Sequence, residues 1–153
     1  MRNELKLKNQ ICFPLYVSSK EVIRRYKPLL DEVNLTYTQF IVLLVLWEER
    51  SINVNDLGKR LFLDSGTLTP LLKKLEIKGY ITRNRSKHDE RNVIITISEE
   101  GLSLKDKCIN IPSKVYSNIG LNSSELQTLY KLLYKIISNV EQKVEKDNFG
   151  DLL

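Results

Sequence analysis

The 153-residue sequence predicts a mainly α-helical chain with one small β-hairpin. Apolar residues recur at spacings of three, four and seven along several segments, which is the period of a helix with one buried face. Two short runs, 81–85 and 93–97, instead alternate in character from residue to residue, as half-buried strands do. The longest apolar run, residues 40–47, has eight residues, whereas a membrane span needs ~20. The sequence therefore predicts a globular chain that does not cross a membrane.

Residues 10–30 are expected to form the first helix, because their apolar members fall on one helical face. A proline is tolerated in the first turn of a helix but not in its interior. Pro14 therefore places the start of the regular helix near residues 10–13. This start puts Cys12 in or beside the first turn.

The second helix is expected to begin after Thr36, whose hydroxyl can cap it while Gln39 completes a capping box three residues later. The run that follows, Phe40–Trp47, is apolar on all sides and rich in β-branched residues, so a buried strand is the competing prediction. The capping box and the charged residues 48–50 favour a buried helix.

Two shorter helices, 53–61 and 65–78, are expected next, joined by a tight connection. In the second of them the leucines face inward and the lysines outward. Gly79 is a suitable residue just past the end of this helix. Pro70 leaves two possibilities, because either regular helix begins as late as a Thr67 cap or one backbone hydrogen bond is missing.

Beyond this helix the period of the pattern changes. The two alternating runs flank the polar segment 86–91, which predicts a hairpin with a charged tip. Another helix is expected to open at Ser98. The last helix is expected to use Ser123 or Ser124 as its cap, and it carries a long apolar stripe over residues 126–144.

A helix, a tight turn, a second helix and a two-stranded hairpin, in this order, are the parts of a winged helix-turn-helix. A helix is narrow enough to enter the major groove of DNA. The charge agrees, because residues 54–93 carry nine Lys and Arg against five Asp and Glu in a chain of net charge +5. Local basic charge attracts phosphate, although a solvated basic face is the ordinary alternative. The order of elements therefore predicts double-stranded DNA as a partner.

The candidate DNA-binding residues lie on the second helix of this unit and in the hairpin. They are Ser65, Thr67, Thr69, Lys73, Lys74, Arg83, Arg85, Asp89 and Arg91. Residues near the start of such a helix face base edges, and lysines further along can neutralise phosphates. An arginine at a hairpin tip suits the minor groove, and Asp89 could hold the guanidinium of Arg91. The alternatives are plain capping residues and an ordinary salt bridge within the turn.

The stripe along the last helix needs cover that a small winged unit does not provide. A second copy is the expected cover, because a twofold dimer places two reading helices about one helical turn apart on a palindrome. The alternative is that the terminal helices fold back on their own chain. We therefore expect a single domain over residues 1–153, with dimerisation helices over about 1–35 and 100–153 and the winged helix-turn-helix over about 36–98.

Two motifs, Leu63–Glu76 and Asp89–Arg91, resemble those of the MarR family of winged-helix repressors. Three more, Ile11–Phe13, Tyr26–Leu30 and Leu35–Gln39, are similar to its organic hydroperoxide-resistance (OhrR-like) branch. Together they span most of the chain, and the last helix resembles the family only in its pattern.

The resemblance implies a homodimer whose terminal helices form the interface, and a wing arginine, Arg91, that enters the minor groove. It also implies that Cys12 is a peroxide sensor. Tyr26 and Tyr37 would hydrogen-bond this cysteine from the partner subunit, with Tyr16 a nearby aromatic in the same pocket. Oxidation of Cys12 by an organic hydroperoxide would then release the repressor from its palindromic operator.

The residue types around Cys12 agree with such a sensor. A thiolate is the nucleophile that attacks a peroxide, and the amides and dipole at a helix N-terminus favour the anion. The first product would be a sulfenic acid. Cys108 lies earlier than the resolving cysteine of two-cysteine relatives, so a small thiol is expected to cap oxidised Cys12, with a Cys12–Cys108 bridge as the alternative. Outside the resemblance, Cys12 could also be a buried structural thiol.

Besides a general DNA-coating protein without operator preference, two other function classes stay open. One is a repressor of the same family that responds to a small aromatic ligand, with Cys12 incidental. The other is a thiol peroxidase, but an enzyme is not expected, because the single histidine, His88, falls in the hairpin tip and no metal-ligand cluster or phosphate loop is visible. The chain has no secretory signal and two cysteines, so it is expected in the cytoplasm, without a cofactor.

Overall fold

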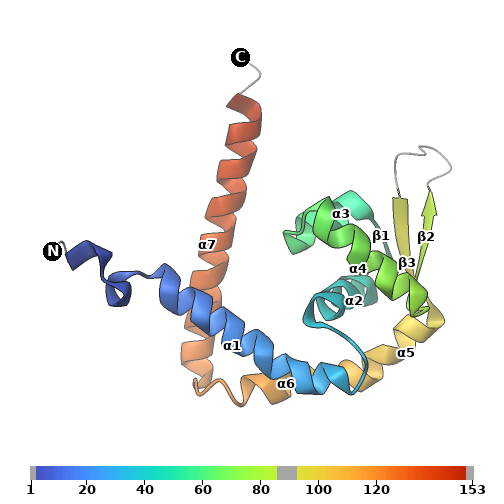
Figure 1. Cartoon of the computed structure of the whole chain (residues 1–153), viewed down its shortest axis with the longest axis horizontal. Helices are drawn as coiled ribbons and strands as arrows, with labels where there is room; N and C mark the ends of the chain where they lie inside the picture. The colour runs from blue at the N-terminus through green and yellow to red at the C-terminus, as the bar shows by residue number, and fades with distance from the viewer. Residues whose placement is uncertain (1–2, 86–92, 151–153) are drawn as a thin grey trace. The chain divides into compact units, whose positions relative to one another are not determined.

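The computed structural model describes residues 3–85 and 93–150 of the chain (Figure 1). The predicted hairpin tip, with His88, Asp89 and Arg91, lies outside the described residues. Contacts divide the chain into two compact units, residues 1–115 and 116–153. The first contains two short 3-10 turns, Asn3–Leu5 and Leu7–Asn9, followed by α1 (Cys12–Asp31), α2 (Tyr37–Glu49), β1 (Ser51–Asn53), α3 (Val54–Leu61), α4 (Ser65–Ile77), β2 (Ile81–Arg85), β3 (Val93–Ile97), α5 (Glu99–Cys108) and most of α6 (Ile111–Tyr116). The second contains α7 (Ser123–Gly150).

The first two helices begin where the sequence predicts. Helix α1 starts at Cys12, which is its first residue. The capping box of α2 is confirmed, because Thr36 Oγ1 accepts from the Gln39 amide at 3.3 Å and Gln39 Oε1 accepts from the Thr36 amide at 3.1 Å. The apolar run that follows is helical and almost entirely buried. The competing strand prediction is therefore wrong. The capping box stabilises the first helical turn of the run, and this outweighs the preference of its β-branched residues for a strand.

Helices α3 and α4 form the helix-turn-helix, and the turn between them is sharp. Phe62, the C-cap of α3, has a φ of 54°, in the left-handed region. Asp64 then caps α4, because its Oδ1 accepts from the Thr67 amide at 2.8 Å. The late start at a Thr67 cap is therefore wrong. Pro70 lies inside the helix, so the missing backbone hydrogen bond is the alternative that holds.

The strands form a three-stranded antiparallel sheet in the order β1-β3-β2. Ile81 pairs with Ile97 across the predicted hairpin, and Ser51 pairs with Thr96 on the other side of β3. The sequence did not predict β1 or α6. A three-residue strand is too short to show alternation, and a six-residue helix too short to show helical spacing.

The core of the first unit forms around α2, which contacts α1, α3, α4, α5, β1 and β3. Phe40 and Leu46 of α2 are fully enclosed. The Trp47 indole N–H donates to the Gly101 carbonyl at 2.9 Å and so ties α2 to α5. Gly101 is required where α5 passes the main chain of Tyr80, because a Cβ there would lie 2.2 Å from the Tyr80 carbonyl oxygen. The packing of α2 against six other elements fixes the platform that carries α4.

Helix α7 is capped by Asn122 rather than by either predicted serine. Asn122 Oδ1 accepts from the Glu125 amide at 3.0 Å, and Glu125 Oε2 accepts from the Asn122 amide at 2.9 Å. Asn122 is the cap because asparagine caps a helix as well as serine does, and Glu125, three residues later, completes a capping box with it. Apolar residues of the predicted stripe lie at the surface of the chain, with Leu132 55% and Ile136 50% exposed. None of the helices in the described part of the chain is both long and apolar enough for a membrane span.

Candidate functional site

Helix α4 presents one packed face and one free face. Leu68, Leu72 and Leu75 on the packed face are fully enclosed. The five predicted DNA-binding residues of this helix are all exposed; they are Ser65, Thr67, Thr69, Lys73 and Lys74. The arrangement leaves hydroxyls in the first turns and ammonium groups further along, which suits base edges and phosphates respectively.

The start of α4 is organised by a carboxylate. Asp64 accepts the Thr67 amide through Oδ1 and the Thr67 hydroxyl through Oδ2 at 3.1 Å. These hydrogen bonds, the amide contact first, lower the pKa of Asp64 below its ordinary value. The predicted alternative, in which serine or threonine is the cap itself, is therefore wrong. The hydroxyl of Thr67 nevertheless takes part in the capping network.

The two arginines of β2 have different surroundings. Arg83 is partly buried, and its Nη1 lies 3.8 Å from Glu76 Oε2 of α4. Its buried Nε has no hydrogen-bond partner within the described residues. Arg85, at the end of the strand, is exposed. Arg83 thus links β2 to α4, and for both arginines contact with DNA stays a prediction.

The two cysteines lie in opposite environments. Cys12 is exposed, whereas Cys108 is 2% exposed, and burial raises the pKa of the Cys108 thiol. Around Cys12 the first turn of α1 offers fewer free amides than expected, because Pro14 has no N–H and the Phe13 amide donates to the Gln10 carbonyl at 3.2 Å. Of the two thiols in the single chain, Cys12 is therefore the one open to a reagent in water, and its role as a sensor stays a prediction.

The predicted sensor tyrosines lie far along the same helix from Cys12. Tyr26 is buried, and its ring lies 5.1 Å from that of Tyr37, edge to face. Tyr16 is 64% exposed. Cys12 and Tyr26 are fourteen positions apart along α1, which is about 21 Å at the rise of an α-helix. A contact between Cys12 and this tyrosine therefore needs a second copy of the chain, and the predicted hydrogen bonds stay predictions.

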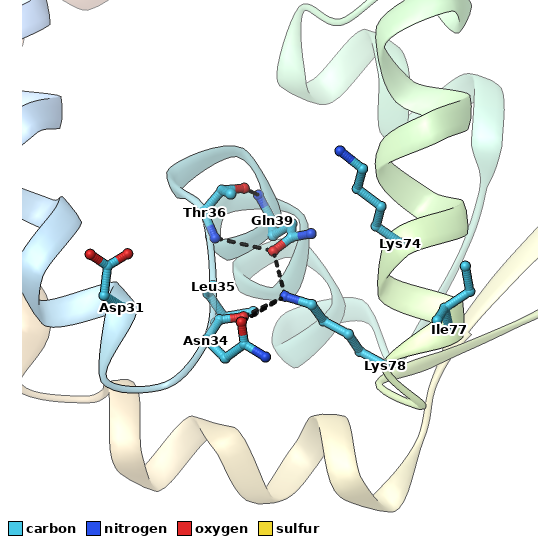
Figure 2. Close-up of a pocket in the computed structure, with 8 residues that line it drawn as sticks. All are labelled: Asp31, Asn34, Leu35, Thr36, Gln39, Lys74, Ile77 and Lys78. Atoms are coloured by element: carbon cyan, nitrogen blue, oxygen red, sulfur yellow. Dashed lines mark hydrogen bonds between the residues drawn. The ribbon is translucent and has the colours of Figure 1, made fainter.

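A cavity of about 370 Å³ lies between the α1–α2 turn and the carboxyl end of α4 (Figure 2). Its lining consists of Asp31, Asn34, Leu35, Thr36, Gln39, Lys74, Ile77 and Lys78. Sequence reasoning missed Lys78, which it treated as an outward lysine. The capping box gave the position of Gln39, but no signal in the sequence links the two residues.

Comparisons with known proteins agree with this geometry. The family described as Transcriptional regulator SarA/Rot matches residues 24–108. The organic hydroperoxide resistance transcriptional regulator of Bacillus subtilis is 45% identical over 141 residues, which cover 92% of this chain and 96% of that protein.

Among solved structures, reduced AbfR bound to DNA has a TM-score of 0.75 and 32% identity, and the match covers 91% of this chain and 97% of that one. AbfR, a protein of Staphylococcus epidermidis, is also similar in its disulfide form, with a TM-score of 0.64, 33% identity and coverage of 89% and 96%. A mutant of Escherichia coli MarR complexed with operator DNA has a TM-score of 0.77 and 25% identity, with coverage of 86% and 98%. The chain therefore belongs to the MarR family of winged-helix regulators, in its organic hydroperoxide-resistance (OhrR-like) branch.

Proposed function

We propose that this protein is a DNA-binding transcriptional repressor that senses organic hydroperoxides through Cys12. It acts as a homodimer on a palindromic operator in the cytoplasm, and oxidation of Cys12 releases the operator. The protein is a stoichiometric sensor and not an enzyme.

The observation that carries the proposal is the contrast between the two thiols. Cys12 is exposed at the first residue of α1, whereas Cys108 is enclosed and has a raised pKa. A thiolate reacts with peroxide only where the reagent can reach it. The contrast supports a single reactive sulfur in the native chain.

The chemistry needs one oxidant and one thiol. The Cys12 thiolate attacks the terminal oxygen of the hydroperoxide, the O–O bond breaks, and the sulfur takes the hydroxyl and becomes a sulfenic acid. The alkoxide that leaves takes a proton from water and departs as the alcohol. A small thiol then displaces water from the sulfenic acid and forms a mixed disulfide. The reduced, DNA-bound AbfR and the disulfide form of the same relative support a redox cycle of this kind.

The exposed face of α4 supports the DNA-binding half of the proposal. Its hydroxyls and lysines extend from a helix that four buried leucines hold in place. The exposed apolar residues of α7 support the dimer, because an apolar stripe of this length is usually covered by a partner.

The test compares Cys12→Ser with the matched control Cys108→Ser. Binding to a duplex from upstream of the protein's own gene, against a scrambled duplex, is measured by fluorescence anisotropy before and after stoichiometric cumene hydroperoxide with a small thiol. We expect wild type and Cys108→Ser to release the operator and Cys12→Ser to stay bound. Mass spectrometry of the same samples identifies the modified sulfur and what is attached to it.

Three outcomes contradict the proposal. Wild type that keeps its affinity after Cys12 is oxidised removes the sensing step. If the Cys12→Ser variant also releases the operator after treatment with oxidant, a group other than Cys12 is the sensor. Repeated turnover of peroxide with excess thiol makes the protein an enzyme.

A further inference from the structure

Lys78, the C-cap of α4, extends across to the turn between α1 and α2 (Figure 2). Its ammonium donates to the main-chain carbonyl of Asn34, to Gln39 Oε1 at 3.2 Å and, at a longer 3.5 Å, to Asn34 Oδ1. An ammonium has three N–H donors and no acceptor. All three donors of Lys78 can therefore be used on this one turn.

The partners of Lys78 are neutral oxygens. The carboxylate that lines the same cavity, Asp31, is paired with Lys27 at 2.6 Å. Burial, and then the charge of nearby Lys74, lowers the pKa of Lys78. An exposed lysine would keep its full hydration, so the structure holds this charge in place at some cost. Such a placement indicates a positional role for the side chain.

The contact leads to the start of α2. Gln39 is 3% exposed, and the oxygen that accepts from Lys78 also accepts from the Thr36 amide in the capping box. Tyr37 is the first residue of α2, two positions before Gln39, and its ring packs against Tyr26. Lys78 therefore binds the residue that fixes where α2, and with it Tyr37, begins.

Asn34 holds the other half of the contact in a defined shape. Its φ is 54°, a left-handed conformation that asparagine tolerates better than most residues. The Asn34 amide donates to the Asp31 carbonyl at 3.0 Å and the Leu35 amide to the Leu30 carbonyl at 2.9 Å. The carbonyl that Lys78 binds is thus part of a hydrogen-bonded turn and moves with the end of α1.

We infer that Lys78 is a positioning residue that ties the carboxyl end of the DNA-reading helix α4 to the α1–α2 turn between the two tyrosines. A displacement of Tyr37 moves Gln39, and Lys78 passes the movement to α4. Coupling between the tyrosines and α4 can be carried by hydrogen bonds that join the two. Lys78 supplies such hydrogen bonds. The inference rests on the proposed function, because it assigns the route by which oxidation alters DNA binding.

The experiment measures a release factor, defined as the operator Kd of the oxidised protein divided by that of the reduced protein. Lys78→Met removes the charge and keeps the length of the side chain. Lys78→Arg keeps donors for the same oxygens, and Lys105→Met on α5 is the matched control for loss of one surface charge. Gln39→Met and the double variant with Lys78→Met complete a double-mutant cycle.

We expect Lys78→Met to lower the release factor by about two- to thirtyfold, the range of residues that modulate coupling without touching a ligand. Lys78→Arg should restore part of the factor, and Lys105→Met should leave it unchanged. The effect of the double variant should be smaller than the sum of the two single effects, because both changes remove the contact between Lys78 and Gln39. The dependence of reduced-state binding on salt should keep its slope.

Other results separate the inference from the proposed function. If wild type releases the operator and Lys78→Met has the same release factor, the inference is wrong and the proposed function stands. If Lys78→Met lowers the salt slope by about one with the factor unchanged, Lys78 is a phosphate contact instead. If wild type itself keeps the operator after Cys12 is oxidised, the proposed function fails, and the inference fails with it.

Discussion

At the scale of single residues, burial separates two chemically identical side chains. Cys12 and Cys108 are both thiols, but one is exposed at the start of a helix and the other is enclosed at the end of another. Burial in apolar surroundings disfavours the thiolate, so the pKa of Cys108 is raised. The difference concerns reactivity, and alkylation measures it directly.

Native protein treated with iodoacetamide at pH 8 should be labelled at Cys12 first. Cys108 should react at least about tenfold more slowly, because it is enclosed and its raised pKa lowers the fraction present as thiolate. Peptide mass spectrometry of time points gives both rates, and labelling in urea is the control that makes both thiols accessible. Equal rates in the native protein would contradict the assignment.

A second residue-scale prediction concerns Gly101. A methyl group there would lie 2.2 Å from the Tyr80 carbonyl oxygen and 2.8 Å from Ile97 Cγ1. Gly101→Ala should therefore lower the free energy of unfolding by about 1–3 kcal/mol or more, measured by urea denaturation. Gly120→Ala is not a suitable control, because Gly120 has a φ of 81° and an alanine in that conformation would itself destabilise the fold. Ser103→Ala, at an exposed site of the same helix, is the better one.

At the scale of elements, the start of α4 depends on one ionised side chain. Hydrogen bonds from the Thr67 amide and hydroxyl favour the Asp64 carboxylate and lower its pKa from 3.8. The unfolded chain then binds a proton at Asp64 more readily than the folded chain does. The stabilising contribution is complete above about pH 4 and is lost as pH falls through the lowered folded pKa.

Asp64→Asn tests this dependence, because asparagine caps a helix as well but does not titrate. Wild type should lose more stability than Asp64→Asn between pH 6 and pH 3, measured by urea denaturation followed by circular dichroism. Equal losses of stability in the two proteins would show that Asp64 does not contribute to the loss of stability at acid pH.

At the scale of the whole molecule, the apolar surface of α7 is the feature with the largest consequence. Several large apolar side chains of this helix, among them Leu132, Ile136 and Val140, are about half exposed. A monomer rarely leaves so long a stripe open to water. A dimer through this helix would also supply the second copy that brings a Cys12 to the tyrosines of the partner.

Ile136→Glu should therefore disrupt the dimer, because a carboxylate would be buried without a partner in an apolar interface. Light scattering with size exclusion should show a mass near that of one chain, and operator affinity should fall at least about tenfold because two half-sites can no longer be bound together. Lys131→Glu, on the opposite side of the same helix, should remain dimeric. A dimeric Ile136→Glu variant would exclude this face.

Much of the site was predictable from particular residues. Thr36 and Gln39 form a capping box that is local in sequence, so the start of α2 follows from four adjacent residues. The start of α1 at Cys12 follows from Pro14, and the exposed face of α4 follows from the spacing of its leucines and lysines. By contrast, β1 forms only because β3 lies beside it, and the cap of α7 is decided by a competition among three adjacent polar residues.

The sequence by itself determined the helices other than α6, the two strands of the hairpin, their order and the family, because periodicity, caps and motifs are properties of neighbouring residues. Only the tertiary structure decided which cysteine is exposed and that Arg83 pairs with Glu76, because burial and ion pairing depend on segments that are brought together by folding. The contact of Lys78 with Asn34 and Gln39 is of the same kind. It joins residues about forty positions apart, and no local pattern encodes a contact over that distance.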